Sequence, residues 1–179
     1  MPGLVVGTAG FTGKSVHRNA DFRVNNTNPD FAGINGRITL TDVHARWQHQ
    51  GWDLQGLYAK GMIGDAVEIN GAINTYNLAN PGDERAFVPA EFYGWLVQLA
   101  YKIQVCEKAT LTPFARYEEF DTQSKISAGL AADPANKDKV TTVGVSFHPH
   151  HMVAFKADYQ SYADNSDNSR FNLGMGYMF

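Results

Sequence analysis

The sequence predicts an all-β protein that folds as an antiparallel transmembrane β-barrel, and three observations lead to this class. Apolar and polar residues alternate with a period of two along several segments. Tight turns and long polar loops alternate between those segments. Aromatic residues gather near both ends of the segments, as they do at the two interfaces of a membrane. Together these features predict eight strands whose apolar side chains face lipid and whose polar side chains face water.

The composition agrees with one domain of this class. The 179 residues include 15 lysines and arginines, 18 aspartates and glutamates, and one cysteine. No apolar run approaches the ~18 to 20 residues of a membrane-spanning helix, and a net charge of -3 gives no reason to expect a nucleic acid partner. Cys106 alone cannot form an internal disulfide or a cysteine zinc site. No export signal is visible near Met1, so we expect either a removed signal or a piece of a longer chain.

The first three predicted strands lie near residues 3–13, 37–48 and 51–64. The first is too rich in glycine for a face to be assigned. The third begins with Trp52 and Leu54, and its alternation blurs further along. The second strand alternates between an apolar set and a polar set, which are Val43, Ala45 and Trp47 against Asp42, His44, Arg46 and Gln48.

The fourth strand, near residues 91–105, alternates most strongly. In a helix its apolar residues would scatter around the cylinder, whereas in a strand they form one face. That face reads Tyr93, Trp95, Val97, Leu99, Tyr101, Ile103 and Val105. The fifth strand, near residues 108–121, alternates more weakly between Leu111, Ala115 and Tyr117 and the polar residues Thr110, Thr112, Arg116 and Glu118.

The last three strands lie near residues 138–148, 151–163 and 169–179, and each has two distinct faces. Their apolar positions are Val143, Val145, Phe147, Val153, Phe155, Ala157, Tyr159, Phe171, Leu173, Met175, Tyr177 and Phe179. Their opposite positions include Ser146, His148, Lys156, Asp158, Gln160 and Asn172.

The connections between the strands alternate in length. Those after the second, fourth and sixth strands are tight turns at residues 49–50, 106–107 and 149–150. Those after the other strands are longer and rich in Asn, Asp, Gly and Pro. Outer-membrane barrels combine short periplasmic turns with long extracellular loops in this way. We expect the connection over residues 66–89, which contains "AVEINGAINTYNL", to fold inward, pack against the barrel wall and narrow a pore.

Alternation alone does not say which face is outside, because a soluble barrel or β-sandwich buries its apolar face. The polar face is too rich in charges for a dry core, which favours a wet interior. The candidate pore-lining residues are Asp42, His44, Arg46, Gln98, Lys102, Arg116, Glu118, Lys156, Asp158 and Gln160. With Asp53 included, four bases face four acids, and these residues alone indicate no anion filter. They fit either a field across a pore or the salt-bridged interior of a closed barrel.

We expect no enzyme, no cofactor and no bound metal. The histidines at 148, 150 and 151 lie in a predicted turn, where successive side chains point to opposite faces. Ser146, His148 and Asp158 allow a hydrolytic arrangement to be drawn, but a satisfied polar interior explains them better.

Several stretches carry a resemblance to a known family. The terminal "RFNLGMGYMF", with Tyr177 and Phe179, resembles the C-terminal signal strand that the barrel-assembly machinery of Gram-negative outer membranes reads. The stretches "LTPFARYEEFDT" and "VTTVGVSFHPHHMVAFKADYQ", with the final strand, resemble the closing strands of the phosphate-selective porin O and P family. The resemblance extends less specifically to "GTAGFTGKS" and "ITLTDVHARWQHQGWDLQGLYAKG".

This resemblance implies a sixteen-stranded trimeric channel with a preference for anions such as phosphate, located in the outer membrane of a Gram-negative bacterium. Residues 1–179 supply eight strands, so they would form either a closed small barrel or the C-terminal half of a larger one. The partners implied are outer-membrane lipid and lipopolysaccharide, the barrel-assembly machinery, and copies of the chain or other chain segments that complete the barrel.

The sequence therefore predicts a porin-like channel for passive diffusion of small hydrophilic solutes or ions. The alternative is a closed eight-stranded outer-membrane barrel that acts as a structural or adhesion scaffold through its long extracellular loops.

Overall fold

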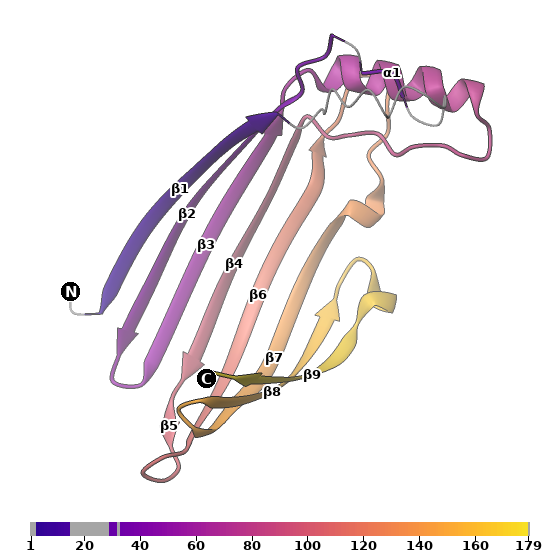
Figure 1. Ribbon diagram of the computed structural model, residues 1–179. Coiled ribbons are helices and arrows are strands. Elements are labelled where there is room, and N and C mark those ends of the chain that lie inside the picture. The colour runs from indigo at the N-terminus through magenta and orange to yellow at the C-terminus, as the bar shows by residue number, and fades with distance from the viewer. Residues whose placement is uncertain (1–2, 15–28, 32, 179) are drawn as a thin grey trace.

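The computed structural model describes residues 3–14, 29–31 and 33–178, which form one antiparallel sheet and one α-helix (Figure 1). The all-β antiparallel prediction is confirmed. The strands of the described chain are β1 (Leu4–Lys14), β2 (Arg37–His49), β3 (Trp52–Ile63), β4 (Glu91–Tyr101), β5 (Ile103–Gln104), β6 (Thr110–Lys125), β7 (Lys137–His150), β8 (Val153–Tyr162) and β9 (Arg170–Tyr177). The helices are α1 (Ala66–Ala79) and the short 3-10 turns η2 (Pro134–Asn136) and η3 (Ser166–Asn168).

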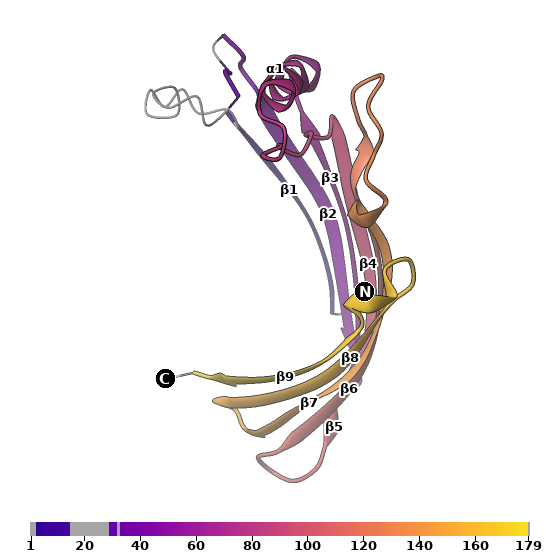
Figure 2. The ribbon, with the colours of Figure 1, turned by 90° about the vertical axis from the view of Figure 1, so that its right-hand side faces the viewer.

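The sheet follows the chain. Its order is β1-β2-β3-β4-β6-β7-β8-β9, with β5 paired to β6, so each strand lies beside its neighbours in sequence. The sheet curves strongly, and Figure 2 shows it as an open trough with β1 and β9 at its two separate edges. Among the described strands, β1 pairs only with β2 and β9 only with β8. The closure of these eight strands into a small barrel is therefore not seen in this structure.

The strand expected over residues 91–105 is divided into β4 and β5, so the described chain has nine strand segments instead of eight. The register of β4 with β6 ends at Ala100 opposite Phe114 and resumes at Ile103 opposite Leu111. Continuing it across the gap places Tyr101 opposite Pro113, which has no N–H group to donate to a ladder. The interruption has a local cause and leaves the order of the sheet unchanged.

All three tight turns lie later in the chain than predicted. The β5–β6 turn consists of Glu107 and Lys108, because the N–H of Ala109 donates to the carbonyl oxygen of Cys106 over 3.3 Å. The β2–β3 turn consists of Gln50 and Gly51, one residue later than expected, with φ values of 48° and 89°. Two successive positive φ angles are typical of the type I′ turn, whose twist matches that of a hairpin. Strand β7 extends to His150, with a register shift between Phe147 and His150, so the β7–β8 turn also comes later in the chain.

The two faces of the sheet differ in exposure. On the apolar face of β9, Leu173 is 76% exposed and Met175 is 73% exposed, whereas on the polar face Asp158 is 5% exposed and Thr142 is fully buried. Side chains converge on the inside of a curved sheet and diverge on its outside. The polar face is therefore the concave face of the trough in Figure 2.

Two glycines support this assignment. A Cβ atom added to Gly144, on the polar face, would lie 2.5 Å from Cβ of Asp158 and 2.7 Å from the carbonyl oxygen of Ala157. A Cβ added to Gly56, on the apolar face, would approach no atom closer than 3.9 Å. The polar face is crowded at Gly144, and the apolar face is open at Gly56.

The connection over residues 66–89 holds a helix, which the sequence interpretation did not include. Helix α1 buries Ala66, Ile69, Ile73 and Tyr76, whose spacing of three and four residues places them on one side of the helix. The helix lies across the loop end of the sheet (Figure 1), and its long-range hydrogen bonds go to connecting segments at that end instead of to the middle of the strands. These hydrogen bonds hold the helix at the loop end of the sheet, and the narrowing of a pore by this connection stays a prediction. No described helix is long and apolar enough to cross a membrane.

Candidate functional site

The register of the sheet brings the predicted interior residues together on the concave polar face. Residues paired across antiparallel strands point to the same side, and nine of the ten candidates share this face: Asp42, His44, Arg46, Gln98, Arg116, Glu118, Lys156, Asp158 and Gln160. The tenth, Lys102, lies in the gap between β4 and β5, where its backbone N–H donates to the carbonyl oxygen of Gly51 over 2.8 Å.

An arginine and an aspartate join the hairpin of β2 and β3 on this face. The guanidinium of Arg46 donates two hydrogen bonds from Nε to Asp53, at 3.0 and 3.1 Å, and a closer one from its terminal nitrogen. Side-chain amides of Gln48 and Gln55 also donate to this carboxylate, at 2.9 and 3.2 Å. Asp53 is therefore saturated by four side-chain donor groups from two strands, counting both guanidinium nitrogens.

Three further ion pairs lie along single strands. Arg116 Nε lies 2.8 Å from Oε2 of Glu118, and Lys156 Nζ lies 3.0 Å from Oδ2 of Asp158. His44 Nδ1 lies 2.8 Å from Oδ1 of Asp42, a pair that is ionic when the imidazole is protonated. Each pair joins residues two apart, which share a face of a strand. Bases and acids are thus intermixed on this wall, and opposed basic and acidic ladders are absent from its described strands.

One row of the register crosses seven neighbouring strands and contains no acid. It runs from β2 to β9 through Arg46, Gln55, Gln98, Arg116, Thr142, Gln160 and Arg170. We call these seven residues the amide belt. Gln55, Thr142 and Arg170 were not among the candidate residues. The alternation placed Thr142 on the polar face opposite Val143, but a single sequence does not give the register that joins these residues in one row.

The members of the amide belt differ in their partners. Arg46 and Arg116 are paired with acids from the adjacent rows, whereas Arg170 donates to the side-chain oxygen of Gln160 over 3.0 Å and to the hydroxyl of Tyr162 over 3.1 Å. Thr142 is fully buried, and its hydroxyl has no hydrogen-bond partner within the described chain.

A depression of about 810 Å³ opens at the turn end of the polar face. It is lined by Arg46 and Asp53 of the first hairpin, by Lys102 and by His148 of β7. The structure therefore places Lys102 at the turn end of the candidate surface, between the amide belt and the turns. Asp158, which could be combined with Ser146 and His148 in a hydrolytic arrangement, instead forms an ion pair with Lys156. It also accepts a hydrogen bond from the side-chain amide of Asn172 over 3.0 Å.

The convex face carries aromatic pairs near both ends of its apolar band. The rings of Trp52 and Tyr101 lie 4.7 Å apart near the turns, and those of Trp95 and Tyr117 lie 5.4 Å apart toward the loops. The register places Tyr58 opposite Trp95 in that second group. The predicted grouping of aromatic residues at the two ends is thus present on one face.

Beyond the second aromatic group the convex face becomes charged. Glu91 forms ion pairs with Lys60 and Lys125, and the hydroxyl of Tyr93 donates to Glu119 over 3.3 Å. The change from apolar to charged side chains occurs on the neighbouring strands β3, β4 and β6. The apolar band of the convex face therefore ends at a similar level on all three strands.

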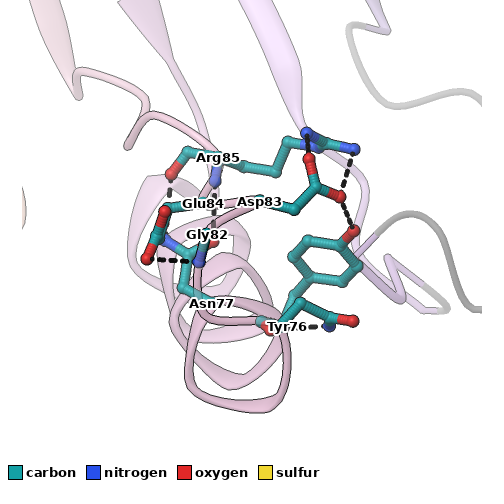
Figure 3. A network of polar contacts seen from close by, with 7 residues as sticks. Tyr76, Asn77, Gly82, Asp83, Glu84 and Arg85 are labelled. Atoms are coloured by element: carbon teal, nitrogen blue, oxygen red, sulfur yellow. Dashed lines mark hydrogen bonds and ion pairs between the residues drawn. The ribbon is translucent and has the colours of Figure 1, made fainter.

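A polar network beside α1 fixes the connection that follows the helix (Figure 3). Asp83 accepts a hydrogen bond from the hydroxyl of Tyr76 over 2.7 Å and forms an ion pair with Arg85 at 2.6 Å. These two donors, the Tyr76 hydroxyl first, lower the pKa of Asp83 below its usual value, while the same carboxylate raises the pKa of Tyr76. The backbone N–H of Gly82 lowers the pKa of Glu84 in the same turn.

The remaining candidate residues have simpler surroundings. Tyr177, in the predicted assembly signal, lies at the end of β9 opposite Val153 and is 64% exposed, and Phe179 lies outside the described residues. Cys106 is exposed in the turn between β5 and β6. Within the part of the chain that the structure describes, no group of three or more His, Cys, Asp or Glu side chains is placed to hold a metal ion.

The chain is similar in sequence to an uncharacterized protein and aligns with a solved outer membrane protein structure. No family model matches the chain. It is 29% identical over 151 residues to an uncharacterized protein of Aquifex aeolicus (strain VF5), an alignment that covers 80% of this chain and 34% of the relative. The chain thus spans about a third of that relative's length. The outer membrane protein Ail of Yersinia pestis, solved in a phospholipid bilayer nanodisc, aligns over 98% of both chains with 15% identity and a TM-score of 0.33.

Proposed function

We propose that these strands form part of the wall of an outer-membrane β-barrel whose polar face lines a water-filled path for small hydrophilic solutes. The observation that carries this proposal is the contrast between the two faces. Large apolar side chains remain exposed over the convex face, while charged and amide side chains pair with one another on the concave face. A soluble sheet would have the opposite arrangement, because water favours the burial of apolar surface.

The convex face matches the requirements of a bilayer. Its aromatic groups flank an apolar band, and the charges around Glu91 begin beyond the group that contains Trp95. Lipid-facing strands carry such a band of about 25 Å between two aromatic girdles. In this proposal Lys60 and Lys125 lie at the level of the outer-leaflet headgroups, where their cations suit the phosphates of lipopolysaccharide.

The edges of the sheet require further strands. Unpaired backbone groups in the hydrocarbon region cost several kcal/mol each, so β1 and β9 would each need a partner there. In this proposal those partners are strands of a longer chain or of another copy, which would give a barrel wider than eight strands and leave a channel inside. The barrel-assembly machinery would recognise β9, whose convex face carries Phe171, Leu173, Met175 and Tyr177.

Neighbouring residues on opposite faces provide a direct test. We would replace Cys106 by serine and compare Gln98→Cys on the polar face with Val97→Cys on the apolar face, in protein reconstituted into planar bilayers. A charged, water-soluble thiol reagent should react with the Gln98→Cys variant and reduce its single-channel current. The Val97→Cys variant should react only after the protein is unfolded. Reaction at position 97 in the membrane, with none at position 98, would refute the proposal.

The scaffold function is the second candidate, and helix α1 is the observation that favours it. This helix lies at the loop end of the sheet, fixed by buried hydrogen bonds, and presents Val67 and Leu78 at 67% and 78% exposure. Exposed apolar side chains on a rigid element suit contact with another protein. A folded, inserted protein that conducts no ions would support this function and exclude the channel.

A further inference from the structure

We infer that the polar wall favours neutral, hydrogen-bonding solutes such as sugars over inorganic anions, an inference that rests on the proposed channel. The wall contains as many acids as bases. In the described strands and the β4–β5 gap, its bases are Arg46, Lys102, Arg116, Lys156 and Arg170, and its acids are Asp42, Asp53, Glu118, Asp138 and Asp158. Five bases against five acids leave no net charge to attract an anion.

The placement of the acids matters more than their number. Arg116 and Lys156 each form an ion pair, at 2.8 and 3.0 Å, with an acid on the same strand. The guanidinium of Arg46 donates hydrogen bonds to the carboxylate of Asp53. At the distance of a passing solute each pair acts as a short dipole, whose field falls off faster than that of a single charge. The paired carboxylate repels a phosphate ion and so weakens its binding to each of these three cations, whereas Lys102 and Arg170 form no ion pair within the described chain.

The amide belt offers a different kind of contact. The side chain of Gln98 lies between Gln55 and Arg116 in this row, is partly exposed, and makes no hydrogen bond within the described chain. Gln160 uses its carbonyl oxygen for Arg170, which leaves its NH₂ group available. Because an amide carries both donors and acceptors, it matches a hydroxyl group, which also donates and accepts. Gln98 and Gln160 lie on β4 and β8, with β6 and β7 between them, so they suit hydroxyl groups at separate places on a solute.

Two adjacent glutamates allow the charge balance to be tested without disturbing the fold. Glu118 points to the polar face and pairs with Arg116, whereas Glu119 points to the convex face and accepts from Tyr93. We would measure the reversal potential of the reconstituted protein in a salt gradient. Wild type should show a chloride-to-potassium permeability ratio near one.

The variants should then move this ratio in opposite directions. Glu118→Gln exposes the charge of Arg116 and should raise the ratio, Arg116→Gln should lower it, and the double variant should return it to the wild-type value. Glu119→Gln, which makes the same chemical change on the other face, should leave the ratio unchanged. A wild-type channel with strong anion selectivity, or equal effects of the changes at 118 and 119, would overturn the inference.

The solute class itself is tested by the swelling of proteoliposomes in glucose and in gluconate, which are similar in size and differ in charge. Glucose should enter at least as fast as gluconate, and Gln98→Leu should slow glucose more than Val97→Leu does. Faster entry of gluconate would overturn the inference and leave the channel in place. Entry of neither solute into vesicles that hold folded protein would refute the channel as well.

Discussion

Asn70 and Ser127 are far apart in the sequence, yet the side-chain amide of Asn70 donates a hydrogen bond to the Ser127 hydroxyl over 2.9 Å. The same amide group donates to the carbonyl oxygen of Val88 at 2.9 Å and accepts from its N–H at 2.8 Å. The Ser127 hydroxyl in turn donates to the carbonyl oxygen of Ala66. One buried asparagine therefore ties helix α1 to the connections before β4 and after β6.

Replacing Asn70 by alanine should release α1 from these connections while the sheet stays folded. The change removes three hydrogen bonds and leaves the part-buried backbone N–H and C=O groups of Val88 without this partner, a loss of about 1 to 3 kcal/mol. Hydrogen–deuterium exchange should show faster exchange in α1 and unchanged exchange in β4. Asn74→Ala, an exposed position on the same helix, is the matched control and should have little effect. Equal exchange in the two variants would show that the Asn70 contacts do not hold the helix.

The network around Asp83 should weaken in acid. Its pKa is lowered, so the ionised form stabilises the network at pH values above the ordinary 3.8, and this contribution is lost as the pH falls through the lowered pKa. Tyr76→Phe removes the principal cause, so the pKa of Asp83 should rise toward 3.8 and the loss should begin at a less acidic pH. Carboxyl NMR titration would measure this shift. The pKa of Glu84, which is lowered chiefly by the Gly82 N–H, should change less than that of Asp83 and serves as an internal control.

The sequence predicted the faces of the sheet well, because successive side chains of a strand point to opposite faces and the two faces here differ in polarity. Tyr93, Trp95 and Val97 had to lie on one side of a strand whatever its neighbours were. The polar candidates shared a face for the same reason. The sequence also held a signal for their pairing that the interpretation did not use, since Arg116 and Glu118, and Lys156 and Asp158, have the spacing of neighbours along one strand face.

The parts that sequence reasoning missed depend on contacts between distant segments. Helix α1 has a weakly amphipathic sequence, and its position depends on Asn70 contacting Val88 and Ser127, which lie in other connections. The amide belt depends on the register of seven strands, and neither Gln55 nor Thr142 belongs to a recognisable motif. The break after Tyr101 depends on Pro113 lying opposite, again a property of the pairing.

Substitution of Gly144 by alanine should destabilise the sheet by about 1 to 3 kcal/mol, because a Cβ atom there would overlap crowded neighbours. One of these neighbours is the backbone carbonyl oxygen of Ala157, at 2.7 Å, which cannot move aside as a side chain can. Gly56→Ala, on the open face, should be tolerated. Urea unfolding followed by tryptophan fluorescence would compare the two variants. Equal unfolding midpoints would contradict the crowding of the polar face.

Replacing Leu173 by arginine should distinguish a lipid-facing surface from one exposed to water. Leu173 lies near the middle of β9 on the apolar face and is 76% exposed. An arginine facing the bilayer midplane costs about 2 to 4 kcal/mol and one near an interface about 0 to 1 kcal/mol, whereas an exposed arginine in water costs almost nothing. Leu173→Arg should therefore reduce folding into phospholipid vesicles, measured as the equilibrium between folded and unfolded chains in urea.

Gly174→Arg provides the matched control, because position 174 is the next residue, lies on the polar face and has no atom within 4 Å of an added Cβ. This variant should insert as well as wild type, since its guanidinium would remain in water beside Lys156 and Asp158, which occupy the neighbouring strand. If the two arginines had the same effect, the apolar face would not be in contact with hydrocarbon. A loss confined to Leu173→Arg requires an environment that rejects charge on one face of β9 and accepts it on the other, and a membrane with a water-filled interior behind it supplies both.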